Sequence, residues 1–258
     1  MTSFKRIIIV TIDSIIGGGK STLLQRLGPV LKKKYNIINS LVAEPSQQWE
    51  TDGLLSEMYS AIEEMNKVKA HSPNDVKAIE RAGRGIPGLF QVYAFCTRSA
   101  AFMRGYRQAK ELLEMNSNTE YVLLLSERSI LTDQQVFASL LSTAGLISEV
   151  QYKFYQGCFD AFASIVQECK PDLCVWLNTT PDEGLKRIQI RDRQGEIVSA
   201  EYEHLLYQKH CELFGSGSFC GIPVLKINGN VKFHECDVEL DNIAELIANR
   251  VQAIAVKQ

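Results

Sequence analysis

The sequence predicts an α/β fold in which helices cover both faces of a mostly parallel sheet of five strands. Short apolar runs, rich in β-branched residues, alternate along the chain with longer segments of helical periodicity. The first of these runs leads through a glycine-rich turn directly into a helical segment. With 258 residues, 45% of them hydrophobic and 22% charged, the chain can bury one large core. We therefore expect residues 1–258 to form a single domain.

The strands are expected where the apolar runs are short. These runs are Arg6–Ile12, Ile37–Ala43, Tyr121–Leu125, Leu173–Leu177 and Pro223–Ile227. The crossover and final helices are expected in the longer segments, at Ser21–Tyr35, Leu89–Met115, Glu149–Glu168, Pro181–Arg191, Ala200–Phe214 and Asp241–Val256. Gly28 and Pro29 are expected to kink or end the first helix, because proline lacks the backbone donor that a helix interior needs.

Two segments do not follow this alternation. Residues from about 64 to 87 mix charged side chains with glycine, proline and serine, which predicts an exposed insertion or a mobile loop. Residues 191–199 form a polar, arginine-bearing break between two helical segments, which is typical of a lid over a charged ligand.

Composition argues against several classes of function. Lysine plus arginine total 28 and aspartate plus glutamate 30, so the net charge of −2 gives no reason to expect binding to nucleic acid or to an anionic membrane. No apolar run approaches the roughly 18–20 residues of a membrane span. The start of the chain lacks a secretory core, and the seven cysteines include no C-x-x-C pair, so we expect a cytoplasmic protein with reduced thiols. The histidines show no metal-ligand spacing and are expected at the surface or in helix packing.

The segment Ser14–Thr22 follows the first strand and opens the first helix, which is the context of a phosphate-binding loop. Glycines at positions 17–19 let backbone N–H groups point toward one anion at the positive end of the helix. Lys20 is expected to reach the β- and γ-phosphates, and the Ser21 hydroxyl to bind Mg²⁺. Ser14 replaces the first glycine of the usual pattern, and we expect it to hold a positive φ at a cost of about 1 kcal/mol. The loop predicts binding of a Mg-nucleotide; the alternative is a glycine-rich turn without a ligand.

Polar residues follow three of the expected strands, where open parallel sheets bind their ligands. Glu44-Pro45 ends the second strand, Ser126–Ser129 the third and Asn178–Pro181 the fourth. A carboxylate there can take a proton from an acceptor hydroxyl, and a neighbouring arginine can steady transferred charge. An isolated Glu-Pro is more often a cap or a surface residue. A phosphate loop in the same sheet favours the functional interpretation, and we expect Lys20 and Glu44 to share one cleft.

Three arginines lie in or beside the expected lid. Arg187 and Arg191 are one helical turn apart and share a face, and Arg193 lies in the lid segment. The forked guanidinium group suits bidentate contact with phosphate. The alternative is a solvated basic helix face.

In this order the motifs resemble the deoxyribonucleoside kinase family, in particular its deoxycytidine and deoxyguanosine kinases. The matching motifs extend over nearly the whole chain: Asp13–Thr22, Glu44-Pro45 with Trp49, Leu54–Tyr59, Phe90–Ala94 with Arg98, Glu127–Ser129 with Asp133 and Phe137, Pro181–Arg193, and Tyr202–His210. The resemblance implies a P-loop kinase fold with an arginine-rich lid. It implies transfer of the γ-phosphoryl group of ATP or another nucleoside triphosphate, with Mg²⁺, to the 5′-hydroxyl of a deoxyribonucleoside in nucleotide salvage. It also implies a homodimer.

The resemblance also implies a role for each matching residue. Glu44 resembles the general base on the 5′-hydroxyl, Arg128 its partner at the reacting oxygen, and Glu127 a magnesium-side carboxylate; with Lys20 these are the candidate catalytic residues. The candidate ATP-binding residues are Ser14, Gly17, Gly18, Gly19, Lys20, Ser21, Thr22, Arg187, Arg191 and Arg193, with Ser21 and Glu127 as candidate Mg²⁺ ligands. The candidate nucleoside-binding residues are Glu44, Trp49, Tyr59, Phe90, Gln91, Arg98, Arg128, Asp133, Phe137 and Glu196.

Within this second set, the resemblance divides the nucleoside between base and sugar. Gln91 is similar to the amide that pairs with the nucleobase, between the aromatic walls Trp49 and Phe137. Tyr59 and Glu196 are similar to the residues that bind the sugar 3′-hydroxyl.

Arg98 and Asp133 resemble a charged pair that thymidine-preferring members replace with apolar residues. Such a pair suits the amino group of cytosine or a purine edge, so deoxycytidine or purine deoxynucleosides are the expected substrates; a buried ion pair without contact to substrate is the alternative. Asp13, Ser14 and a lid one residue shorter depart from the family pattern. Two other functions stay open: a nucleoside monophosphate kinase of the thymidylate type, and an inactive relative with a structural or nucleotide-sensing role.

Overall fold

The computed structural model describes residues 5–165, 170–193 and 195–256, and it confirms the predicted α/β fold with a central parallel sheet. In the described residues the sheet has the strand order β2-β3-β1-β4-β6-β5. Five strands are parallel, as predicted: β1 (Arg6–Asp13), β2 (Asn39–Val42), β3 (Tyr121–Glu127), β4 (Leu173–Asn178) and β6 (Ile222–Asn228). The prediction missed β5 (Ser218–Phe219), which pairs antiparallel to β6, because two residues are too short for a periodic signal.

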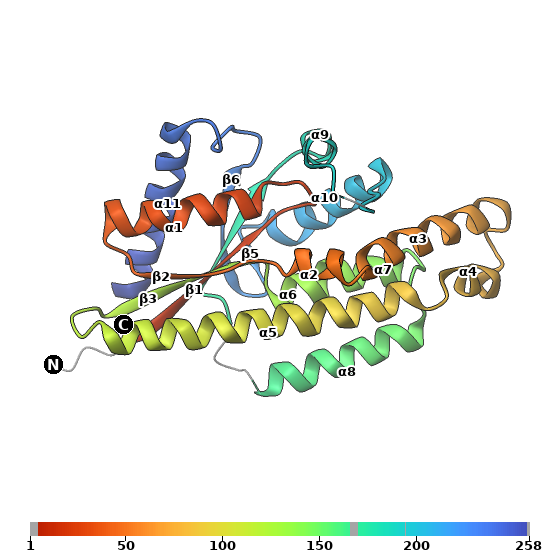
Figure 1. Cartoon of the computed structure of the whole chain (residues 1–258), viewed down its shortest axis with the longest axis horizontal. Helices are drawn as coiled ribbons and strands as arrows, with labels where there is room; N and C mark the ends of the chain where they lie inside the picture. The colour runs from red at the N-terminus through yellow and green to blue at the C-terminus, as the bar shows by residue number, and fades with distance from the viewer. Residues whose placement is uncertain (1–4, 166–169, 194, 257–258) are drawn as a thin grey trace.

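The two faces of β1 are covered by different helices, which follows from the alternation of side chains along a strand. Ile8, Val10 and Ile12 are buried against α1 (Lys20–Tyr35) and α11 (Asp237–Val256). Ile9 faces the other way and packs in the cluster that includes Phe102 on α5 (Ile86–Met115). Figure 1 shows α1 and α11 on one side of the sheet, with α5 along the other side and α8 (Glu149–Ile165) beside α5.

One further helix packs on the sheet: Leu206 and Phe214 of α10 (Ala200–Phe214) are buried in one cluster with Trp176 of β4 and Phe219 of β5. The other helices lie in the segments that follow β2, β3 and β4 in the sequence. They are α2 (Ser46–Thr51), α3 (Leu54–His71), α4 (Val76–Gly83), α6 (Ile130–Thr132), the π-helical stretch η1 (Asp133–Ala138), α7 (Ser139–Thr143) and α9 (Pro181–Arg191). Of the helices in the described residues, none is both long enough and apolar enough to cross a membrane.

One of the two outcomes expected at Pro29 was wrong: α1 does not end there but continues to Tyr35, the predicted end of the helix, with Leu27 and Leu31 on either side buried in the core. The expectation of a loop at residues 64–87 was also wrong. This segment is largely exposed, but most of it is helical, because α3, α4 and the start of α5 occupy it. Buried Met65 and Ile79 pack together with Leu141, Leu146 and Ile147 in one cluster. Gly83 allows this packing, because a Cβ there would lie 2.4 Å from the Met65 sulfur.

Candidate active site

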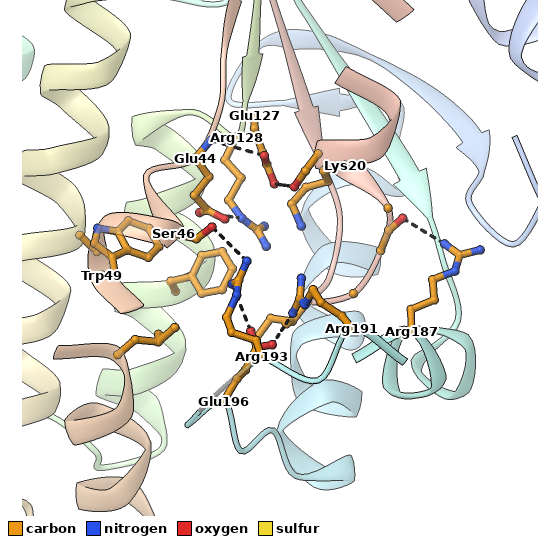
Figure 2. Close-up of a pocket in the computed structure, with 18 of the residues that line it drawn as sticks. Lys20, Glu44, Ser46, Trp49, Glu127, Arg128, Arg187, Arg191, Arg193 and Glu196 are labelled. Carbon is orange, nitrogen blue, oxygen red and sulfur yellow. Dashed lines mark hydrogen bonds and ion pairs between the residues drawn. The ribbon is translucent and has the colours of Figure 1, made fainter. Parts of the chain in front are cut away.

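A cavity of about 480 Å³ lies beyond the carboxyl ends of the central strands. Its walls come from the phosphate loop and from α2, α3, α5, η1, α9, α10 and the segment between α9 and α10. Figure 2 shows Lys20 and Glu44 approaching the same space from different elements. The expectation that these two residues share one cleft is therefore met.

The phosphate loop turns between β1 and α1 through glycines in the left-handed conformation. Gly17 has a φ of 67° and Gly19 a φ of 91°, which other residues rarely adopt. Lys20 is the first residue of α1, and its Nζ donates to the carbonyl oxygen of Ile15 at 2.9 Å. Burial, followed by the charge of Arg128, lowers the pKa of Lys20 to about 8.

Ser14 differs from its predicted role. It is not among the residues with positive φ, so the expected strain of about 1 kcal/mol is absent, and the loop's left-handed geometry falls on Gly17 and Gly19 instead. The Ser14 hydroxyl donates to the carbonyl oxygen of Leu177 at 2.7 Å. Ser14 does not line the cavity, and its hydrogen bond links the phosphate loop to β4.

The Ser14→Gly variant is expected to keep its kcat/KM for the nucleotide donor within about three-fold, because the hydroxyl faces β4. Its free energy of unfolding should fall by about 1–2 kcal/mol, because the variant loses a buried hydrogen bond and gains backbone entropy in the unfolded state. Steady-state kinetics and urea denaturation measure the two effects. A large loss of activity at unchanged stability would contradict this assignment.

A cluster of charged side chains occupies the centre of the cavity, where β2 and β3 end. Glu44 Oε1 lies 2.5 Å from Arg98 Nη2 and 3.3 Å from Arg128 Nε. Burial raises the pKa of Glu44, but Arg128, Arg98 and Lys20 outweigh it and lower the pKa to about 2. The Glu44 carboxyl is therefore ionised at neutral pH and can accept a proton.

Arg128 is held by the backbone and by an aromatic ring. It has a φ of 62°, a strained value for a residue other than glycine and one often found at functional sites. Its Nη1 donates to the carbonyl oxygen of Ser14 at 2.7 Å, and its guanidinium lies 4.4 Å from the centre of the Phe137 ring. These contacts fix the guanidinium between Glu44 and the phosphate loop.

Glu127 and Ser21 form a pair of oxygen ligands beside Lys20. Ser21 Oγ donates to Glu127 Oε1 at 3.0 Å, and both residues line the cavity. A hydroxyl and a carboxylate are the hard oxygen donors that Mg²⁺ prefers. Within the residues that the structure describes, no three His, Cys, Asp or Glu side chains gather as a metal cage. The donor set fits an ion that arrives with nucleotide phosphates rather than one held by the protein alone.

The far end of the cavity combines aromatic walls with a buried polar cluster. Trp49 and Phe90 meet edge to face, with ring centres 5.6 Å apart. Beside them Gln91 Nε2 donates to Asp133 Oδ1 at 2.5 Å, and Arg98 Nη1 forms an ion pair with Asp133 Oδ2. Asp133 begins the π-helical stretch η1. Flat apolar walls around a few hydrogen-bonding groups suit a planar heterocycle.

Arginines from α9 and the following segment close the cavity. Arg191 and Arg193 both form ion pairs with Glu196, whose side chain is 4% exposed. Arg193 also reaches across to α2, where its Nη2 donates to Ser46 Oγ at 3.2 Å and its Nε lies 3.4 Å from Glu50 Oε2 (Figure 2). The predicted lid thus crosses from the phosphate side to the opposite wall; its residue 194 lies outside the described residues.

Of the candidate site residues, all except Ser14 line this one cavity: Gly17, Gly18, Gly19, Lys20, Ser21, Thr22, Glu44, Trp49, Tyr59, Phe90, Gln91, Arg98, Glu127, Arg128, Asp133, Phe137, Arg187, Arg191, Arg193 and Glu196. The prediction missed Ser46, Met58, Tyr202 and Phe233, and it expected His234, which also lines the cavity, only at the surface or in helix packing. Phe233 follows β6 and would lie 2.9 Å from a Cβ at Gly19. Its position after a parallel strand is the signal that could have identified it.

The comparisons with known proteins agree with this geometry. A family model described as deoxynucleoside kinase matches residues 89–252, which is more than half of the chain. The chain belongs to the deoxynucleoside kinase family. The resemblance inferred from the motifs is thereby confirmed, and the chain is a nucleoside kinase, a phosphotransferase.

The relatives of this deoxynucleoside kinase carry related names. It is 27% identical over 227 residues to a probable deoxycytidine kinase of fowlpox virus, covering 87% of this chain and 80% of the relative. It is 28% identical over 207 residues to deoxycytidine kinase of Rattus norvegicus, covering 80% and 74%. A deoxyadenosine kinase of Dictyostelium discoideum is 34% identical over 105 residues, covering 40% of this chain and 41% of the relative.

Proposed function

We propose that this kinase transfers the γ-phosphoryl group of ATP, or of another nucleoside triphosphate, to the 5′-hydroxyl of deoxycytidine or a purine deoxynucleoside. The observation that carries the proposal is one cavity with a phosphate loop at one end, a buried amide-carboxylate-guanidinium cluster at the other, and Glu44 between them. The relatives named as deoxycytidine and deoxyadenosine kinases support the same substrate class.

Base selection would depend on Gln91 and Asp133. The exocyclic amino group of cytosine or adenine is a donor, and the Asp133 carboxylate and the Gln91 amide oxygen are acceptors. Thymine offers a carbonyl oxygen at the corresponding position, and an acceptor facing a buried carboxylate is disfavoured. Arg98 pairs with the other oxygen of that carboxylate, Oδ2. The proposed preference is therefore for bases that carry an amino group.

In the reaction, Glu44 would accept the proton of the 5′-hydroxyl as the oxygen attacks the γ-phosphorus. Arg128, 3.3 Å from the Glu44 carboxylate, would donate to the reacting oxygens and stabilise the charge that develops on them. Lys20 would contact the β- and γ-phosphates from the start of α1. Ser21 and Glu127 would hold Mg²⁺, which, when bound, neutralises charge on the transferred phosphoryl group.

The lid arginines would exchange partners when the triphosphate binds. Arg187 now pairs with Glu183 at 2.9 Å, and Arg191 and Arg193 pair with Glu196. Phosphate oxygens can replace these carboxylates because guanidinium binds both in a bidentate manner. Glu196 would then be free to accept from the sugar 3′-hydroxyl beside Tyr59. Burial and the nearby Glu196 raise the pKa of Tyr59 well above its usual value, so its phenol stays a neutral donor.

We also propose that the kinase acts in nucleotide salvage in the cytoplasm and that it forms a homodimer. The described cysteines, Cys96, Cys158, Cys174, Cys211, Cys220 and Cys236, are all free, in keeping with a reducing compartment. Leu89 on α5 and Val150 and Phe154 on α8 are large apolar side chains that are 64%, 77% and 64% exposed. Exposed apolar side chains on two helices that pack together support association between copies of the chain.

An acceptor panel tests the function. The purified kinase is offered γ-labelled ATP and Mg²⁺ with each deoxynucleoside and, separately, with each deoxynucleoside monophosphate. We expect label in the 5′-monophosphate of deoxycytidine or of a purine deoxynucleoside, with kcat/KM for thymidine at least about ten-fold lower. Label only in diphosphates would identify a monophosphate kinase, and no transfer to any acceptor would identify an inactive relative. Either result would overturn the proposal.

A further inference from the structure

Tyr155 on α8 is a buried polar residue that the reaction described above does not use. It is 1% exposed and does not line the cavity. Its hydroxyl donates to Asp133 Oδ1 at 2.8 Å. Tyr155 therefore contacts the carboxylate proposed to recognise the base without lining the cavity itself. The helix that carries it packs beside α5. The contact joins α8 to the π-helical stretch η1 at the wall of the base pocket.

The Asp133 carboxylate has three partners, two hydrogen-bond donors and one guanidinium group. Gln91 Nε2 donates to Oδ1 at 2.5 Å, Tyr155 donates to the same oxygen, and Arg98 pairs with Oδ2. Gln91 and Tyr155 together occupy the two lone pairs of Oδ1. The Gln91 amide has a second N–H and a carbonyl oxygen for the base, but Oδ1 can accept from an amino group of the base only after the Gln91 N–H leaves it. After that exchange, Tyr155 is the neutral donor that stays on Oδ1. The lone pair that Gln91 vacates then faces the cavity.

The ring of Tyr155 is held rigidly, so its hydroxyl has little freedom to follow a moving carboxylate. Tyr152 stacks on it with ring centres 6.4 Å apart and planes at 6°. Phe95 on α5 meets it edge to face, at 5.7 Å and 72°. Burial also raises the pKa of Tyr155 well above its usual value, so the phenol stays protonated and remains a donor. A fixed donor holds the carboxylate in one orientation.

We propose that Tyr155 is a positioning residue for base selection: it holds Asp133 so that the Oδ1 lone pair released by Gln91 points at the exocyclic amino group of the bound base. The inference rests on the proposed function, because it assigns a role at the same base pocket. It predicts that Tyr155 matters for nucleosides that carry the amino group and not for their oxo counterparts. Deoxycytidine and deoxyuridine form the sharpest pair, since they differ at that group.

The test is Tyr155→Phe, which removes the hydroxyl and keeps the ring. We expect the KM for deoxycytidine to rise about ten-fold, with kcat changed less than about two-fold, because a hydrogen bond to a buried carboxylate is lost. The kcat/KM for deoxyuridine should stay within about two-fold. Tyr152→Phe is the matched control: it removes a hydroxyl from the neighbouring stacked ring and should leave both nucleosides unaffected.

A double-mutant cycle separates positioning from general support of the fold. In an Asp133→Ala background, Tyr155→Phe should have no further effect on the selectivity for deoxycytidine over deoxyuridine. Equal losses for both nucleosides, or the same loss with Asp133 absent, would overturn the proposal. The acceptor panel with the wild-type kinase tests the proposed function independently of these variants. A wild type active on deoxycytidine, with unchanged selectivity in Tyr155→Phe, would reject this inference alone.

Discussion

Replacing Glu44 with glutamine is expected to lower kcat about a hundred-fold or more while deoxynucleoside binding stays nearly unchanged. Glutamine has almost the same shape, so it can still occupy the space between Arg98 and Arg128. It cannot accept the proton of the 5′-hydroxyl. The low pKa of Glu44, about 2, means that the wild-type residue is ionised throughout the physiological range. The loss should therefore persist at every pH between about 6 and 9.

Two measurements separate the expected loss of kcat from the expected unchanged binding of the nucleoside. Steady-state kinetics give kcat, and calorimetry gives the dissociation constant of the nucleoside in the absence of donor. Glu57→Gln is a suitable control, because Glu57 is an exposed carboxylate on α3 that pairs with Arg84 away from the cavity. A near-normal kcat in Glu44→Gln would remove Glu44 from the mechanism.

The second large effect concerns Glu203, whose carboxylic acid is buried without a partner. Both of its carboxyl oxygens lack a hydrogen bond in the described structure, and the residue is fully buried. It lies against α9, where a Cβ on Gly184 would be 3.0 Å from Glu203 Oε1. Burial raises the pKa of Glu203 to about 8, even though Lys20 and Arg128 act to lower it. The folded protein therefore keeps a proton that the unfolded chain releases near pH 4.5.

Because the folded state binds more protons in this range, the free energy of unfolding should fall as pH rises toward 8, by up to about 1.4 kcal/mol per pH unit. Two other titrating groups limit the pH range in which this slope can be measured. The pKa of His210 is lowered by burial to about 3, so below pH 6.5 it gives a slope of the opposite sign. The pKa of Lys20, lowered to about 8, does the same at higher pH. The clearest window is therefore pH 6.5 to 8.

Urea denaturation across this window measures the slope. We expect the wild type to lose about 1–2 kcal/mol between pH 6.5 and 8, and Glu203→Gln to lose much less because glutamine does not titrate. Glu201→Gln changes an exposed acid on the same helix and should keep the wild-type slope. A Glu203→Gln protein with the wild-type slope would show that another group carries the pH dependence.

Much of this kinase could be predicted from sequence because the signals are local. The five parallel strands appear as short apolar runs, and the glycines at 17–19 followed by Lys20 mark a strand-to-helix turn that suits an anion. Glu44 and Glu127 were identified because residues that end parallel strands gather at one edge of a sheet. Each of these inferences needs a window of only a few residues.

Other features were decided by contacts between segments far apart in the chain. The Ser14 hydroxyl donates to the Leu177 carbonyl oxygen on β4, and residues 64–87 become helical because Met65 and Ile79 find a buried partner surface. Tyr155 on Asp133 and the unpartnered burial of Glu203 have no local signature either. Hydrophobic periodicity and turn chemistry determine which elements form. The hydrogen bonds and the buried charges depend on which elements the packed fold brings together, so they emerged only with the tertiary structure.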